Sequence, residues 1–375
     1  MLPLSPPFPP LSALLVAGLL CLTAPAAVAQ EGSAPVPPQL TTDDVAPIMT
    51  RAVDAVIRPG YQAFRRSAGA LAERTAEFCD TPSTETRTAV DAAFRQAIAD
   101  WSRIEIVRTG SVLEKNRFER VLFYPDRKGT GLKQVQAVLQ RNDEADASPA
   151  AMPGKSVAVQ GLGALEYVLY GTGADALLAQ PGSFRCRYGA AVAANIEATA
   201  AEIAAAWDAP ELRQAWIRPG PDNPVFRTGK EAMTELLGIL VHGAETVRDQ
   251  RIETFYRNGE TPRPKSAIYW RSGNTWASID ANIEGLRTLF DKAGMASFVD
   301  PGFASIAGDI DFVTKSLRRV LPTLDPDIAR AVSDPDQRQK IDFLLVNSRD
   351  LITRLDGEYG GAIGLNAGFS FADGD

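Results

Sequence analysis

The chain has almost no histidine. Its 375 residues include only one, His242. A zinc site with two histidine ligands therefore cannot form within one chain, and a Ser-His-Asp triad would need His242 as its base. No nucleophile elbow lies near that histidine, and neither a P-loop nor a dinucleotide-binding fingerprint is present. What remains is carboxylate chemistry, either as oxygen ligands for a metal or as general acid–base groups.

Basic residues are also in the minority. The 39 Lys and Arg residues are outnumbered by 46 Asp and Glu, which gives a net charge of -7 and a pI near 5.1. A chain with this balance lacks the basic face that nucleic-acid binding needs. We therefore exclude nucleic acid as a partner.

Long apolar runs are missing except at the amino terminus. Residues 11–24 (LSALLVAGLLCLTA) are apolar but too few to span a bilayer comfortably, and Ala27-Val28-Ala29 precedes Gln30. Although the first 50 residues contain no Lys or Arg, this pattern predicts a signal peptide over residues 1–29 with cleavage near Ala29. A membrane anchor is the weaker interpretation, because no second apolar segment of spanning length follows. We expect a periplasmic or cell-envelope protein whose mature part has no transmembrane span.

Cysteine is scarce too, and cleavage near Ala29 would leave only Cys79 and Cys186. Two cysteines in an oxidising compartment usually pair, so we predict a disulfide rather than two buried free thiols. Chain-entropy models give a bond that closes so long a loop roughly 4–5 kcal/mol of stabilisation.

No stretch shows the two-residue alternation of a half-buried strand, whereas helical spacing recurs. Thr42, followed by two aspartates, is typical of a helix N-cap, and Ser83 opens a second helix that we expect to end at Gly110. The apolar residues of that second helix keep a three-to-four spacing: Val90, Phe94, Ala97, Ile98, Trp101 and Ile104. We predict an all-α fold.

Proline-rich stretches divide the chain. We expect a linker over residues 30–41, a first helical bundle over 42–207, a second linker over 208–229, and a second bundle with a Gly-rich tail over 230–375. Helices of the second bundle are predicted over residues 230–255, 274–293, 303–321 and 334–359. Two bundles of similar helix number would be explained by a duplication.

Trp101, Glu105 and Arg108 have the spacing i, i+4, i+7 and therefore share one helix face. The stretch RFERVLFYPD (residues 117–126) adds more arginines, a carboxylate and a tyrosine close by. This grouping indicates a polar pocket, and an internal ion pair that supports the bundle is an equal alternative.

A second candidate is Glu166, which lies within the apolar stretch QGLGALEYVLYG (residues 160–171). An acid on so apolar a helix should be paired, or its pKa should rise. Arg108 and Arg120 are the candidate partners. Gly161 and Gly163 leave room for backbone, a neighbouring helix or a ligand to come close.

A third candidate is the pair His242 and Glu245, which lie one helical turn apart. Two such side chains can share a metal ion. We do not favour that role, because the pair stands alone in its helix.

Taken together, the chain resembles the imelysin family, bacterial cell-envelope proteins with links to iron acquisition and a historical label as metallopeptidases. The likeness covers nearly all of the mature chain and rests on the order of several stretches. These are WSRIEIVRTG (101–110), RFERVLFYPD (117–126), FRCRYGAAVAANI (184–196), SGNTWASIDANIEGLRTLF (272–290) and GLNAGFSFADGD (364–375).

The family signature is G-x-H-x-x-E, and here it aligns with residues 161–166. Gly161 and Glu166 match, whereas Gly163 stands where the histidine belongs. His242 does not replace it, since Leu240 occupies the place of the motif glycine. Without imidazole, a carboxylate is a poorer ligand for zinc or ferrous iron but still suits hard cations such as ferric iron.

The resemblance implies a two-bundle protein with a binding site near the meeting of its halves. We expect no catalytic residue, a metal ion (iron first) held by Glu105 and Glu166, and a ligand pocket. The expected pocket residues are Trp101, Glu105, Arg108, Gly161, Gly163 and Glu166.

The predicted function is binding in iron or other metal acquisition. The alternative is a non-catalytic binder of a small anion or of an envelope protein partner. A metallopeptidase is disfavoured, because the motif histidine is absent.

Overall fold

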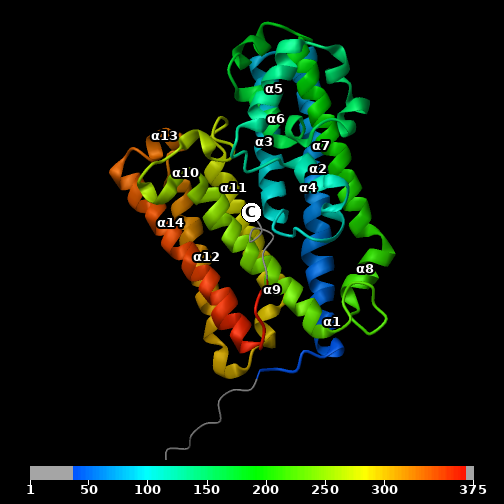
Figure 1. The fold of residues 1–375 in the computed structure, drawn as a ribbon, viewed down its shortest axis with the longest axis vertical. Helices are drawn as coiled ribbons and strands as arrows, with labels where there is room; N and C mark the ends of the chain where they lie inside the picture. Colours follow the sequence, from blue (N-terminus) through cyan, green and yellow to red (C-terminus); the bar gives the residue numbers. More distant parts are fainter. Residues whose placement is uncertain (1–36, 369–375) are drawn as a thin grey trace, which may run out of the picture. The chain divides into compact units, whose positions relative to one another are not determined.

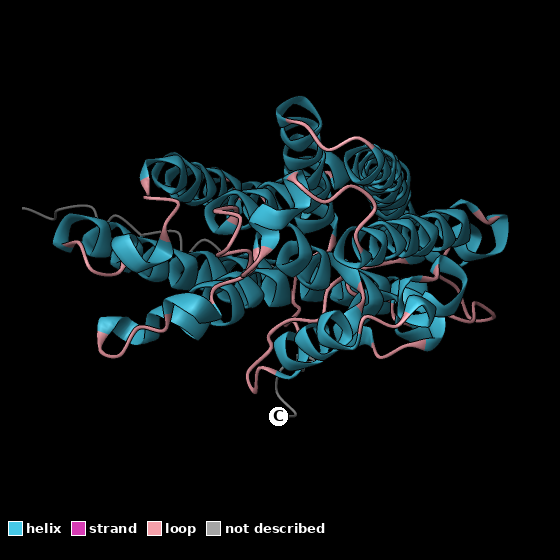
Figure 2. Ribbon diagram, turned by 90° about the horizontal axis from the view of Figure 1, so that it is seen from above, coloured by secondary structure: helices cyan, strands magenta, loops and turns pink. Residues whose placement is uncertain are grey.

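The computed structural model describes residues 37–368, so the predicted signal peptide lies outside the described residues. Within that range the chain consists of helices and loops and contains no strand (Figure 2), which confirms the predicted all-α fold. The α-helices are α1 Thr42–Arg51, α2 Arg58–Asp80, α3 Thr84–Ile104, α4 Arg117–Val121, α5 Thr130–Arg141, α6 Gly161–Tyr170, α7 Phe184–Asp208, α8 Pro210–Ile217, α9 Gly229–Glu245, α10 Thr254–Tyr256, α11 Thr275–Ala293, α12 Ser305–Val320, α13 Ile328–Ala331 and α14 Pro335–Thr353.

Helix starts follow the capping signals closely, with small shifts. Ser83 forms the expected cap of α3, where it and Thr86 hydrogen-bond each other's backbone N–H groups. For α1 the cap is Thr41 rather than Thr42, because the Thr41 side chain accepts from the Asp44 N–H. Helix α3 ends at Ile104, before the predicted Gly110, and Glu105 is its C-cap.

Three of the long helices continue into π-helical turns. These are Ala52–Ile57 between α1 and α2, Thr246–Glu253 after α9, and Arg354–Gly360 after α14. A π-helical turn inserts an extra residue and so re-aims the side chains around it. The turn after α9 carries Arg251 into the protein interior, where this side chain is 2% exposed.

The first-half helices α2, α3 and α7 lie side by side, and α3 also packs against α11 of the second half (Figure 1). Helix α1 packs against α9 and α11, and the predicted linker 208–229 contains α8. Residues 37–368 belong to one contact unit. The division into two bundles therefore stays a prediction, and so does a duplication.

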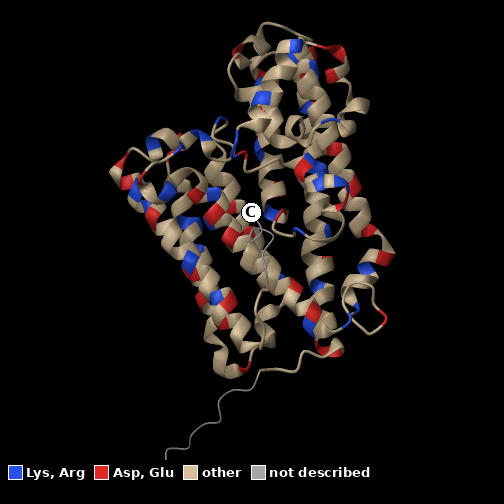
Figure 3. Cartoon of the chain, viewed as in Figure 1, with Lys and Arg blue, Asp and Glu red and all other residues tan. Residues whose placement is uncertain are grey.

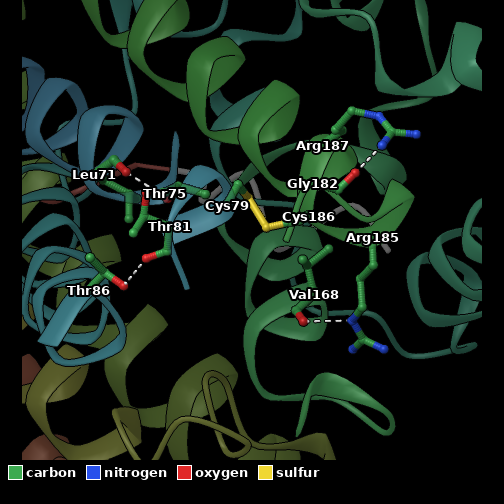
Figure 4. The surroundings of a disulfide bond; sticks show 10 residues. All are labelled: Leu71, Thr75, Cys79, Thr81, Thr86, Val168, Gly182, Arg185, Cys186 and Arg187. Carbon is green, nitrogen blue, oxygen red and sulfur yellow. Dashed lines mark hydrogen bonds between the residues drawn. A yellow bond between two sulfur atoms is a disulfide. The ribbon is translucent and has the colours of Figure 1, made fainter. Parts of the chain in front are cut away.

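The disulfide between Cys79 and Cys186 is present, as predicted (Figure 4). It joins the last turn of α2 to the first turn of α7, with 5.4 Å between the two Cα atoms. The Gly182 N–H donates to the Cys79 carbonyl at 2.9 Å, so the loop before α7 is held to the same helix end.

Acidic and basic side chains are interspersed along the helices rather than gathered by sign (Figure 3). Many form ion pairs on one helix or between neighbours, such as Arg318 with Asp280 at 2.8 Å. Among the described helices, none is both long and apolar enough to cross a bilayer.

Candidate functional site

Two neighbouring cavities contain most of the polar residues that the sequence singled out. The larger, about 160 Å³, is lined by Glu166 and Gly163 and is called here the Glu166 cavity. The smaller, about 60 Å³, is lined by Glu105 and Arg108 and is called the Glu105 cavity. The side chain of Tyr124 lines both and so forms part of the wall between them.

Glu166 lies on α6 and is only 3% exposed. Its Oε1 accepts hydrogen bonds from the backbone N–H of Ser272 at 3.0 Å and from the Ser272 hydroxyl at 2.9 Å. The guanidinium of Arg271 lies 3.7 Å from Oε2. The predicted partners were wrong: Arg108 pairs with Glu119, and Arg120 lies near Glu202.

Burial raises the pKa of Glu166, and this effect outweighs the hydrogen bonds from Ser272 and the charge of Arg271, which lower it. The sequence analysis expected such an acid to be either paired or raised in pKa. The structure shows both, because a contact of 3.7 Å to one guanidinium does not offset the loss of water around the carboxylate.

The loop before α11 forms the opposite wall of the Glu166 cavity. Trp270 lies between two cations, with the Arg271 guanidinium 4.5 Å and the Lys265 ammonium 5.9 Å from its ring centroid. Arg271 also lies 5.2 Å from the ring centroid of Tyr167 on α6. The aromatic rings hold the guanidinium at the cavity by cation–π contacts, and its side chain remains 17% exposed.

The two glycines of α6 have different roles. Gly161 has a φ of +76°, and a Cβ placed there would lie 2.4 Å from the carbonyl oxygen of Val121. This residue must be glycine for α6 to approach the C-terminal end of α4 so closely. A Cβ at Gly163 would meet nothing within 4 Å, and the residue lines the cavity.

Reasoning from the sequence missed the loop residues Tyr269, Trp270, Arg271 and Ser272. Tyr269 has a φ of +51°, its buried hydroxyl has no hydrogen-bond partner, and burial raises its pKa. The run Tyr269-Trp270-Arg271 places two aromatic residues beside an arginine, a pattern that indicates a binding site. No periodicity pointed to it, because the run lies between helices.

The Glu105 cavity lies at the C-terminal end of α3. Glu105 Oε1 accepts from Arg251 at 2.8 Å and from the Asn282 amide at 2.8 Å. This buried ion pair joins the two halves of the chain, which is the alternative that the sequence left open for the patch of Glu105 and Arg108. Arg108 stacks on Phe118, with 4.3 Å between the guanidinium carbon and the ring centroid.

Trp101 is fully buried between Phe64 and Phe118 and lines neither cavity. His242 lines the Glu105 cavity, and its Nδ1 lies 2.9 Å from an oxygen of Glu245. Within residues 37–368, no three His, Cys, Asp or Glu side chains come together as a metal-binding group. The metal ligands predicted from the sequence, Glu105 and Glu166, line different cavities.

The chain was compared with protein-family models, curated proteins and solved structures. The family model described as Imelysin (peptidase M75) matches residues 57–355. Among solved structures, an imelysin-like protein from Psychrobacter arcticum has a TM-score of 0.70 at 16% identity, covering 89% of this chain and 100% of its own. An iron-regulated protein A precursor from Parabacteroides distasonis has a TM-score of 0.62 at 13% identity, covering 88% and 96%. None of the curated proteins matches the chain significantly.

Proposed function

Because this chain belongs to the imelysin family, we propose that it is an exported binding protein whose Glu166 cavity holds a small carboxylate-bearing ligand. The observation that carries the proposal is the placement of Arg271. Its guanidinium is held at the cavity by Trp270 and Tyr167. The acidic group that it contacts, 3.7 Å away, is the Glu166 carboxyl, whose charged form is disfavoured by burial. A ligand carboxylate would be a stronger partner for it.

The other charged groups of the cavity support an anion over a bare cation. The carboxylate of Asp126 accepts the backbone N–H groups of Thr130 at 2.6 Å and Leu132 at 3.2 Å, so both of its oxygens serve to cap α5. Glu166 Oε1 is likewise engaged by Ser272. Lys265, by contrast, is exposed and lies over the Trp270 ring. The charged groups of the cavity that are available to a ligand are therefore the cations Arg271 and Lys265.

Export rests on the sequence pattern of residues 1–29, which lie outside the described residues. The name of the Parabacteroides distasonis neighbour, a precursor, agrees with it. The disulfide between Cys79 and Cys186 also suits an oxidising compartment. We propose the periplasm or cell envelope as the location.

Metal acquisition is the second candidate, favoured by the iron-regulated description of the same neighbour. A bare ion at Glu166 would face the guanidinium of Arg271, which opposes its charge. Ferric iron prefers oxygen ligands, so the carboxylate groups of a small molecule can bind it as an anionic chelate. If iron bound to the Glu166 cavity as such a chelate, one site would serve both carboxylate binding and metal acquisition.

Isothermal titration of the mature chain, from Gln30 onward, tests the proposal. The probes are acetate, succinate, citrate and ferric citrate, together with free ferric and divalent ions. We expect a carboxylate to bind and Arg271→Gln to weaken it by about tenfold or more, the loss of one charge-assisted contact. Arg319→Gln, at an exposed arginine, is the matched control.

Flat thermograms for every carboxylate would overturn the proposal. Binding of a free metal ion that weakens in Glu166→Ala would instead support metal acquisition, with Glu166 as a direct ligand of the ion.

A further inference from the structure

Three deeply buried side chains around the Glu105 cavity keep polar atoms that have no hydrogen-bond partner among residues 37–368. Glu105, Arg251 and Asn282 are 4%, 2% and 1% exposed. The unpartnered atoms are Glu105 Oε2, Arg251 Nε and Nη1, and Asn282 Oδ1. Leaving such atoms unsatisfied costs about 1–3 kcal/mol each, so their gathering around one cavity indicates a ligand.

The remaining atoms of the same side chains are firmly held. Arg251 donates through Nη2 to Glu105 Oε1, and the Asn282 amide donates to Glu105 Oε1 and, at 2.6 Å, to the Ser102 carbonyl. The Arg251 guanidinium also lies 4.9 Å from the ring centroid of Tyr124. The free atoms are thus fixed in position before any ligand arrives, which lowers the entropic cost of binding.

The free atoms comprise two acceptors and two donors. Glu105 Oε2 and Asn282 Oδ1 can accept, whereas Arg251 Nε and Nη1 can donate. A carboxylate alone would be repelled by Glu105, and an ammonium alone would be repelled by Arg251. A ligand that carries both groups can pair with Glu105 and with Arg251 at once and leaves the ion pair electrically balanced.

We propose that the Glu105 cavity is a second binding site, separate from the Glu166 cavity, for a small free α-amino acid. Its ammonium group binds at Glu105 and Asn282, and its carboxylate binds at Arg251. The volume of about 60 Å³ admits only a few non-hydrogen atoms. Arg108 and His242, with side chains 39% and 22% exposed, line the cavity on its solvent side.

Isothermal titration of the Arg271→Gln variant, whose Glu166 cavity is weakened for carboxylates, tests this site with glycine, and acetate and methylammonium serve as probes that carry one charged group each. We expect glycine to bind and neither single-charge probe to do so. Equal binding of acetate, or no binding of glycine at millimolar concentration, would overturn the proposal. A crystal soaked in glycine that shows only water in the cavity would do the same.

The variants avoid the buried ion pair, because removing one partner could unfold the chain. Thr246 lines the cavity, so Thr246→Phe should fill it and weaken glycine binding at least about tenfold, the loss of ~1.4 kcal/mol. Thr246→Val, which keeps the side-chain volume, should leave binding unchanged. Gly163→Phe in the other cavity should also leave glycine binding intact, and a loss there would place the glycine site in the Glu166 cavity and overturn the assignment.

Discussion

At the scale of single residues, Glu166 shows how burial and hydrogen bonding compete for one carboxyl group. Its pKa is raised above 4.5 in the folded chain, so the folded state binds this proton more tightly than the unfolded state does. The stabilisation is complete below pH 4.5 and is lost as the pH rises through the raised pKa. We predict that the stability of the wild type relative to Glu166→Gln falls with rising pH, at most by ~1.4 kcal/mol per pH unit.

Urea unfolding of both proteins at a series of pH values from 4.5 upward measures this difference. Glu73→Gln, at an exposed carboxylate, controls for general charge effects. If the stability of the wild type relative to Glu166→Gln rose with pH instead, Ser272 and Arg271 would stabilise the charged form of Glu166 more than burial disfavours it.

The sequence showed that Glu166 would be buried, because its neighbours on α6 are apolar. It could not show which groups meet it. Ser272 is 106 positions away, in a loop whose path depends on how the two halves pack. The same limit explains why Arg108 and Arg120, which are closer in sequence, were predicted as partners and proved to bind other acids.

At the scale of elements, α6 depends on one glycine and tolerates change at the other. Gly161→Ala should destabilise the chain by at least ~2 kcal/mol, because alanine is strained at a φ of +76° and its Cβ would overlap the Val121 carbonyl. Gly163→Ala should be neutral or stabilising by up to ~1 kcal/mol, since open space surrounds that Cβ and alanine favours the helix. Thermal unfolding of the two variants measures both effects, and equal destabilisation would contradict these roles.

The sequence predicted helices wherever apolar residues keep helical spacing over a long stretch, as in α3, α11 and α14. The cavity walls were not, because the turn from Lys265 to Ser272 follows neither helical nor strand spacing. Trp101 illustrates the opposite error. It was predicted to share one helix face with Glu105 and Arg108, yet α3 ends at Ile104, so Arg108 lies beyond the helix. The Trp101 ring lies in the core, where Phe64 and Phe118 enclose it.

At the scale of the whole molecule, the two halves of the described chain meet through close contacts between α3 and α11. A Cβ at Gly285 on α11 would lie 2.1 Å from the carbonyl oxygen of Arg103 on α3. Beside this contact, the hydroxyls of Ser102 and Ser278 are 2.8 Å apart, and the ion pair of Glu105 with Arg251 crosses the same interface. Buried polar contacts of this kind hold two elements in one fixed arrangement.

Gly285→Ala should therefore weaken both halves, because the added methyl group must push α3 and α11 apart and expose the polar contacts between them. Hydrogen exchange measured peptide by peptide, with increasing denaturant, tests this. We expect protection to fall in α3 and α7 as well as in α11, even though the disulfide still ties α7 to α2. If the loss were confined to residues 230–368, the halves would be separately stable, and the two-bundle division predicted from the sequence would hold energetically.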